Sequence, residues 1–285
     1  MKKLVITAAV ALMGLAPALS SATPQQDLKE FREYYLKRFP GVKLQEFADG
    51  IYGIDKGRRE EFEAMMEFPP YEPGLDLGKQ LFAKYNVGKC FKNGGIGIRQ
   101  NYPWFDAKSG TVHTLEGDIM ACLKKNGVDL NAEKIKFGAG GKLAVLSAYM
   151  GYTSRGKKLN VVIPNDPRAL AIYNRGKHHF YAKRGQLNMA CADCHMYHSG
   201  QMARANLISP ALGHPTHFPA YRKNNELTGD PVMGGFVTLE ARYASCNKQV
   251  RAKPFKPQSD EYIALEYFET YMSNGIKVNA PGVRE

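Results

Sequence analysis

Residues 186–200 read QLNMACADCHMYHSG and contain the pattern Cys191-Ala-Asp-Cys194-His195. A Cys-x-x-Cys-His sequence is the attachment signature of a c-type haem, in which two thiols form thioethers and the histidine binds the iron. A zinc site needs a second ligand pair at similar spacing, and a thioredoxin-type motif lies beside a βαβ pattern; the sequence shows neither. The stretch therefore predicts one covalently attached haem c, held by Cys191 and Cys194 with His195 as an axial ligand.

The start of the chain indicates export. The chain has 285 residues and a net charge of +12, from 39 Lys and Arg against 27 Asp and Glu, which favours anionic partners. Lys2 and Lys3 precede an apolar run that ends in Ser20-Ser21-Ala22, which is typical of a secretory signal peptide. We expect a signal peptide at residues 1–22, cleaved near Ala22, and a periplasmic protein with no membrane span and no nucleic-acid partner.

Two halves of the chain share four short patterns in the same order. They are GKQLF (78–82) with GKHHF (176–180), YPWFD (102–106) with FPAYR (218–222), TLE (114–116) with TLE (238–240), and LAVLSAYM (143–150) with ALEYFETYM (264–272). Each copy is too long for a solenoid repeat, so the pattern predicts a duplicated globular domain. We predict a mainly α protein with two cytochrome c-like domains, at 71–163 and 164–285, after a helical N-terminal extension at 23–70.

Two helices of the second half are predicted with their ends. One helical stretch, residues 168–185, is expected to end at Gly185. The other, residues 259–275, is expected to begin with Ser259 and Asp260 as a cap and to end at Gly275.

The first half carries a decayed copy of the haem motif. When Cys90 in GKCFKNGG is aligned with the first cysteine of the motif, Asn93 and Gly94 fall where the second cysteine and the histidine would stand. This half is therefore predicted to hold no haem. Cys122 follows its TLE at the same distance as Cys246 follows the second one. If Cys246 lies near its haem, Cys122 lies near Cys90, and an oxidising compartment favours a disulfide between them. Two separate buried thiols are the alternative.

Cys246 remains as an odd cysteine, which in an exported protein is either intermolecular or reactive. The sixth ligand of a cytochrome c is ordinarily a methionine or a second histidine. The sequence offers such candidates at Met202, Met233, His198, His214 and His217. The repeat favours Cys246 instead, because its counterpart in the first half is expected beside the decayed haem position. A thiolate ligand would lower the reduction potential relative to methionine.

Cationic residues surround Cys246 in the sequence. Arg242 precedes it by four residues, so the two share a helix face, and Lys248 and Arg251 follow. Cations depress a thiol pKa and attract anions. The first half has Asp118 where the second has Arg242, as expected if only the second half handles an anion. A solvated basic face is the alternative interpretation.

Together these features resemble the SoxA family, the catalytic cytochrome subunits of the thiosulfate-oxidising SoxAX complex. The resemblance covers nearly all of the chain after residue 22. It includes the paired cytochrome c-like domains, the haem motif, and RYASCNKQVRAKPF (242–255), in which Arg242 precedes Cys246 by four residues. The sequence resembles the mono-haem members, because Asn93 and Gly94 replace the ligands of a first haem.

The resemblance implies an L-cysteine S-thiosulfotransferase that oxidatively joins thiosulfate to a cysteine of the sulfur carrier SoxYZ. It implies that Cys246 ligates the haem iron and carries sulfur as the nucleophile, and that Arg242 holds the anionic substrate. The reaction releases two electrons while one haem accepts one at a time, so the small cytochrome SoxX is the expected heterodimer partner. A plain electron-transfer cytochrome c and a non-catalytic haem-bearing docking subunit are the alternatives.

Overall fold

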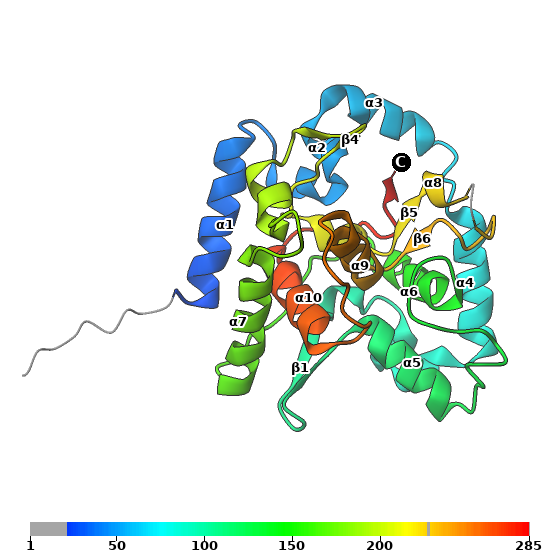
Figure 1. The fold of residues 1–285 in the computed structure, drawn as a ribbon. Coiled ribbons are helices and arrows are strands. Elements are labelled where there is room, and N and C mark those ends of the chain that lie inside the picture. The colour runs from blue at the N-terminus through cyan, green and yellow to red at the C-terminus, as the bar shows by residue number, and fades with distance from the viewer. Residues whose placement is uncertain (1–21, 227–228, 285) are drawn as a thin grey trace, which may run out of the picture.

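The computed structural model describes residues 22–226 and 229–284, and it is mainly helical (Figure 1). The predicted signal peptide at 1–22 lies almost wholly outside these residues. The helices are α1 (Pro24–Arg38), α2 (Ile51–Ile54), α3 (Lys56–Met65), α4 (Glu72–Lys84), α5 (Leu115–Lys125), α6 (Lys142–Tyr152), α7 (Pro167–Tyr181), α8 (Lys223–Glu226), α9 (Leu239–Gln249) and α10 (Asp260–Met272). Among the described helices, none is both long and apolar enough to span a membrane.

The strands are short and form three small sheets. They are β1 (Trp104–Asp106), β2 (Thr111–His113), β3 (Met202–Ala203), β4 (Asn206–Leu207), β5 (Ala220–Arg222), β6 (Phe236–Val237) and β7 (Val283–Arg284). β1 pairs with β2 and β3 pairs with β4, both antiparallel. β5 lies between β6, to which it is antiparallel, and β7, to which it is parallel. In the last sheet, the end of the described chain pairs with the middle strand, β5.

The repeated Gly-Lys-x-x-Phe pattern marks a helix crossing in each half. Gly78 lies on α4 where it crosses α6, and a Cβ at this position would overlap the carbonyl of Val145. Gly176 lies on α7 where it crosses α10, and its Cβ would overlap the carbonyl of Ala264. Figure 1 shows the two crossings in separate halves of the molecule. Both crossings need a residue without a side chain, which explains why this part of the repeat persists.

The two TLE sequences form equivalent helix starts. Thr114 caps α5 by accepting a hydrogen bond from the backbone N–H of Gly117, and Thr238 caps α9 in the same way from Ala241. The order of elements is thus the same in both halves, from α4, α5 and α6 to α7, α9 and α10. This order supports the duplication that we propose for residues 71–163 and 164–285.

The N-terminal extension packs on the second half of the chain, although it precedes the first. Phe31 of α1 makes edge-to-face contacts with Phe180 of α7 and Phe268 of α10. Asp27 of α1 is buried, and its carboxylate accepts hydrogen bonds from the Tyr173 hydroxyl at 2.7 Å and from the Lys177 ammonium at 2.6 Å. One hydrophobic core therefore joins α1, α7 and α10, and a second joins α4, α5 and α6.

A disulfide joins Cys90 to Cys122 in the first half. The Cα atoms are 5.8 Å apart, within the ordinary range, and the bond closes a segment of 32 residues. It connects the turn after α4 to the middle of α5. The alternative of two separate thiols is therefore not what the structure shows.

Candidate functional site

The Cys-x-x-Cys-His segment is folded as a short helical turn that directs three side chains into one cavity. The Asp193 carboxylate accepts a 2.7 Å hydrogen bond from the backbone N–H of Ala190, just before the motif, and Asp193–Tyr197 form a π-helical turn. Cys191, Cys194 and His195 all line a cavity of about 360 Å³. The local geometry thus presents two thiols and an imidazole together, as haem attachment requires.

The imidazole of His195 is arranged as a metal ligand. Its Nδ1 donates a 2.9 Å hydrogen bond to the backbone carbonyl of Ser209, which leaves the lone pair of Nε2 available. Burial lowers the pKa of His195 to about 4, with Arg242 acting in the same direction and the Ser209 hydrogen bond opposing them. The ring is therefore neutral at neutral pH, which is the form that binds iron.

The first helix holds the backbone of this segment in place. The Tyr35 hydroxyl donates to the carbonyl of His195 at 2.7 Å, and the backbone N–H of Ala211 donates to the same carbonyl at 2.9 Å. The Tyr34 hydroxyl donates to the carbonyl of Met196 at 3.1 Å. Tyr35 is fully buried, so water cannot easily replace its hydroxyl as a hydrogen-bond donor.

Cys246 lines the same cavity from α9, and Arg242 lies beside it on the same helix face. A second arginine, Arg222 at the end of β5, also lines the cavity and acts on the thiol. Burial raises the pKa of Cys246, Arg242 and Arg222 lower it, and Glu269 of α10 raises it. The thiol thus faces two cations and one carboxyl group inside a largely apolar pocket.

Two expectations for the surroundings of Cys246 were wrong. The neighbouring cations were expected to depress its pKa, but removal of the thiol from water outweighs them. Lys248 lines a different cavity, and Arg251 follows the end of α9 in a left-handed conformation with φ of 57°. Arg242 is the only one of the three expected cations that lines the thiol's cavity among the described residues.

Arg222 is a site residue that the sequence interpretation missed, although a signal for it was present. It ends the FPAYR pattern, and its counterpart in the first half is Asp106 of YPWFD. This is the same change from acid to arginine that distinguishes Arg242 from Asp118. In the first half, Asp118 instead accepts hydrogen bonds from the Tyr102 hydroxyl and pairs with His113. Two charge reversals therefore mark the half that contains the cavity.

Of the other candidate axial ligands, two line the cavity and three do not. His214 and His217 line the cavity, and the His214 ring stacks on that of His195 with centroids 5.1 Å apart. Burial lowers the pKa of His214 well below its ordinary value, and His195 and Arg242 add to the effect. Outside the cavity lie His198, which contacts Gln201, the exposed Met202 on β3, and Met233, which packs on the first-half core.

The cavity fits a haem c in its charge as well as its ligands. Among the described residues, its charged lining is Arg184, Arg204, Arg222, Arg242 and Arg284 with Glu269. Haem propionates and a small anionic substrate would offset this excess of positive charge. The remaining lining includes apolar and aromatic side chains such as Ile51, Leu207, Phe218 and Leu265.

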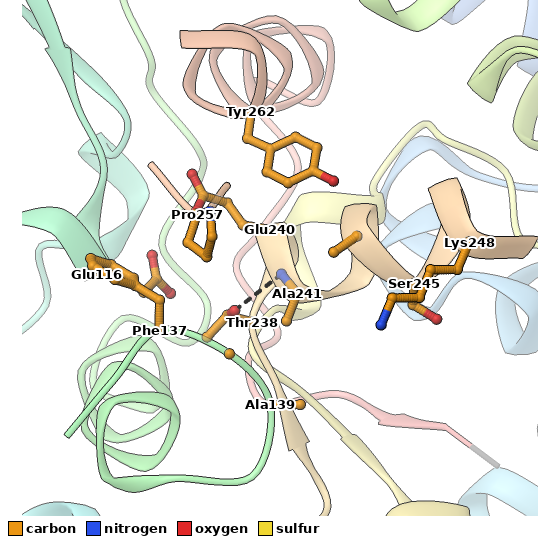
Figure 2. Close-up of a pocket in the computed structure, with 12 residues that line it drawn as sticks. Glu116, Phe137, Ala139, Thr238, Glu240, Ala241, Ser245, Lys248, Pro257 and Tyr262 are labelled. Atoms are coloured by element: carbon orange, nitrogen blue, oxygen red, sulfur yellow. Dashed lines mark hydrogen bonds between the residues drawn. The ribbon is translucent and has the colours of Figure 1, made fainter. Parts of the chain in front are cut away.

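A second cavity, of about 300 Å³, lies between the two halves (Figure 2). Glu116 of α5 lines one side of it, Glu240 of α9 and the capping residue Thr238 line another, and Lys248 lies farther along α9. Burial raises the pKa of Glu240 to about 7; hydrogen bonds from Gln258 oppose this rise and Glu116 adds to it. The cavity contains none of the cysteines or histidines described above.

Comparison with known proteins shows the family of this chain. No family model matches the chain. The chain is 47% identical to the L-cysteine S-thiosulfotransferase subunit SoxA of Chlorobaculum thiosulfatiphilum, over 91% of this chain and 87% of that protein. It is 43% identical to the SoxA subunits of Chlorobaculum tepidum and Allochromatium vinosum, over 98% and 94% of this chain and 94% and 92% of those proteins.

A solved structure agrees with these relatives. The crystal structure of SoxXA from P. pantotrophus matches with a TM-score of 0.65 and 26% identity, covering 79% of this chain and 84% of that one. The mainly helical, cytochrome c-type fold expected from the sequence is thereby confirmed. The chain belongs to the SoxA family of L-cysteine S-thiosulfotransferase subunits.

Proposed function

We propose that this protein oxidatively couples thiosulfate to a cysteine of the sulfur carrier SoxYZ in the periplasm, with Cys246 as haem ligand and sulfur-carrying nucleophile. The observation that carries the proposal is the meeting of Cys246 and Arg242 with Cys191, Cys194 and His195 in one cavity. In this arrangement Cys191 and Cys194 attach one haem c and His195 binds its iron. A bound haem supplies a one-electron redox centre and an iron that favours the thiolate form of Cys246.

The overall reaction joins two sulfur atoms and balances as an oxidation. The carrier thiol and the thiosulfate dianion give a carrier thiosulfonate with one negative charge, one proton and two electrons. The S–H bond of the carrier breaks and an S–S bond forms. The electrons leave to a cytochrome c acceptor, and the SoxX subunit provides a second redox centre in the heterodimer.

The described residues supply the positive charge that brings two negatively charged sulfur reactants together. Arg242 and Arg222 place positive charge beside Cys246, where a dianion must approach a nucleophilic sulfur. Both guanidinium groups are half-buried, so water screens their charge less than it would at an exposed site. Exchange with the carrier thiolate then releases the product from Cys246.

Replacement of Cys246 tests the proposal. The variant Cys246→Ala, in the complex with the partner cytochrome and purified carrier, should lose thiosulfate-dependent reduction of the acceptor. It should also lose the mass increase of the carrier. Ser245→Ala is the matched control, because Ser245 is the adjacent residue and lines the other cavity. Retained coupling in Cys246→Ala would show that this thiol is not catalytic.

Spectroscopy separates the proposal from a plain electron-transfer cytochrome c. Ligation by Cys246 gives a low-spin ferric spectrum with thiolate character and a very negative reduction potential. A methionine-to-iron charge-transfer band with a positive potential would instead support simple electron transfer. The mass of the intact protein gives the haem count, which is expected to be one.

A further inference from the structure

Arg284 is a buried cation with no carboxylate partner among the described residues. It lies on β7, is 8% exposed, and lines the same cavity as His195 and Cys246. Its Nη1 donates to the carbonyl of Val283 at 2.6 Å, and its guanidinium lies over the Tyr52 ring at 5.0 Å. None of the ion pairs within residues 22–226 and 229–284 includes it.

The groups that face Arg284 do not neutralise it. Its Nη2 lies 3.2 Å from Nδ1 of His217, and burial together with Arg284 itself lowers the pKa of that histidine well below its ordinary value. Asp49 is an acid that acts on Arg284, but the Asp49 carboxylate already pairs with Arg59 at 2.7 Å and accepts a hydrogen bond from Asn279. A buried, uncompensated charge is expensive, so the cavity requires an anionic group here.

The position of Arg284 relative to the two haem-attaching thiols identifies that group. Arg184 is the arginine that acts on Cys191, and Arg242 is the one that acts on Cys194. Arg284 acts on His217 and His214 instead. In a haem, the two vinyl groups that form thioethers lie on the edge opposite the two propionates. A haem attached at Cys191 and Cys194 would therefore carry its propionates on the edge away from these cysteines, and Arg284 on β7 lines the same cavity without acting on either thiol.

We propose that Arg284 binds a haem propionate through a charge-assisted, bidentate hydrogen bond. The inference rests on the proposed haem attachment at Cys191 and Cys194. A guanidinium matches a carboxylate in shape. The contacts of Arg284 with the Tyr52 ring and the Val283 carbonyl hold its guanidinium in one orientation before haem binds. Arg222 and Arg242 act on Cys246 and remain available for the sulfur reactants, whereas Arg284 does not act on that thiol. Arg284 is thus assigned to the cofactor, and Arg222 and Arg242 to the substrate.

The reduction potential of the haem tests the assignment. Arg284→Gln removes a positive charge beside the porphyrin, which favours the ferric state, so the midpoint potential should shift downward. The propionate then loses its partner, and the resonance Raman band of propionate bending should shift as well. Arg284→Lys keeps the charge without the bidentate geometry, so it should shift the Raman band with a smaller change in potential. It also serves if the glutamine variant does not fold.

A control variant and the mass of the haem-bearing protein distinguish a failure of this inference from a failure of the proposed function. Arg175→Gln is the matched control, because Arg175 is an exposed arginine that pairs with Asp260 on the surface, and it should change neither readout. Full covalent haem together with unchanged potential and Raman band in both Arg284 variants would overturn this inference alone. A wild-type protein without covalent haem would overturn the proposed function along with it.

Discussion

The protonated Glu240 carboxyl should stabilise this protein at acidic pH, and this contribution should be lost as the pH rises. Burial raises the pKa of this carboxyl from 4.5 to about 7, and the side chain is 7% exposed. A carboxyl with a higher pKa in the folded state binds its proton more tightly there. Its stabilising effect is therefore complete below about pH 4.5 and is lost as the pH rises to about 7. Each tenfold change in proton affinity corresponds to about 1.4 kcal/mol, so ionisation costs about 3 kcal/mol.

The isosteric variant Glu240→Gln isolates this contribution. Its one carbonyl oxygen can accept the hydrogen bond that the backbone N–H of Gln258 donates to Glu240, and its amide N–H can bond to the Gln258 side chain once that amide turns to present its oxygen. Urea denaturation of the haem-bearing protein, measured between about pH 4 and pH 8, should show the variant gaining about 3 kcal/mol relative to wild type. Glu63→Gln, at an exposed position on α3, is the control and should follow wild type. A pH-independent difference for Glu240→Gln would refute the reasoning.

Three further predictions concern stability. The double variant of Cys90 and Cys122 to serine should lose about 4 kcal/mol in chemical denaturation, from the entropy of a 32-residue loop, and equal stability with and without reductant in wild type would contradict this. Gly176→Ala should destabilise by about 2 kcal/mol through overpacking at the α7–α10 crossing. By the same measurement, Gly57→Ala on α3 should be neutral or slightly stabilising, because a Cβ there makes only an ordinary contact with the Asp55 carboxylate at 3.6 Å. Tyr35→Phe should lose about 1 kcal/mol, because it removes the donor to the backbone of the haem-binding turn, and unchanged denaturation midpoints would count against that role.

Local signals predicted the helices well where capping residues settled the ends. Ser259 caps α10 by accepting from the backbone N–H of Tyr262, as expected. The helix was expected to end at Gly275 but ends at Met272, and the chain turns at Gly275 with φ of 80°. α7 was expected to end at Gly185 but ends at Tyr181. There the Arg184 side chain donates to the backbone carbonyls of His179 and Ala182 and replaces the missing helical turn.

The site was predictable only as far as the repeat and the motif reached. They predicted that Cys246 and Arg242 lie beside Cys191 and Cys194, because matching residues in two copies of one domain are expected at matching places in the fold. Arg284 and Glu269 carry no local signal, because they reach the cavity through β7 and through α10, whose positions depend on long-range packing. The docking of α1 on the second half was also beyond the local pattern, since amphipathic spacing shows that a face is buried and not which partner covers it.

The Cys90–Cys122 bond has a consequence for the order in which the chain matures. A chain that emerges from its N-terminus exposes these two cysteines before Cys191, Cys194 and Cys246. Once Cys90 and Cys122 have joined, neither can react with the three cysteines that follow. In the proposed function, Cys191 and Cys194 must stay reduced to react with vinyl groups, and Cys246 must stay free to carry sulfur. The disulfide thus removes the two thiols of the first half from exchange early, before the three cysteines of the proposed site appear.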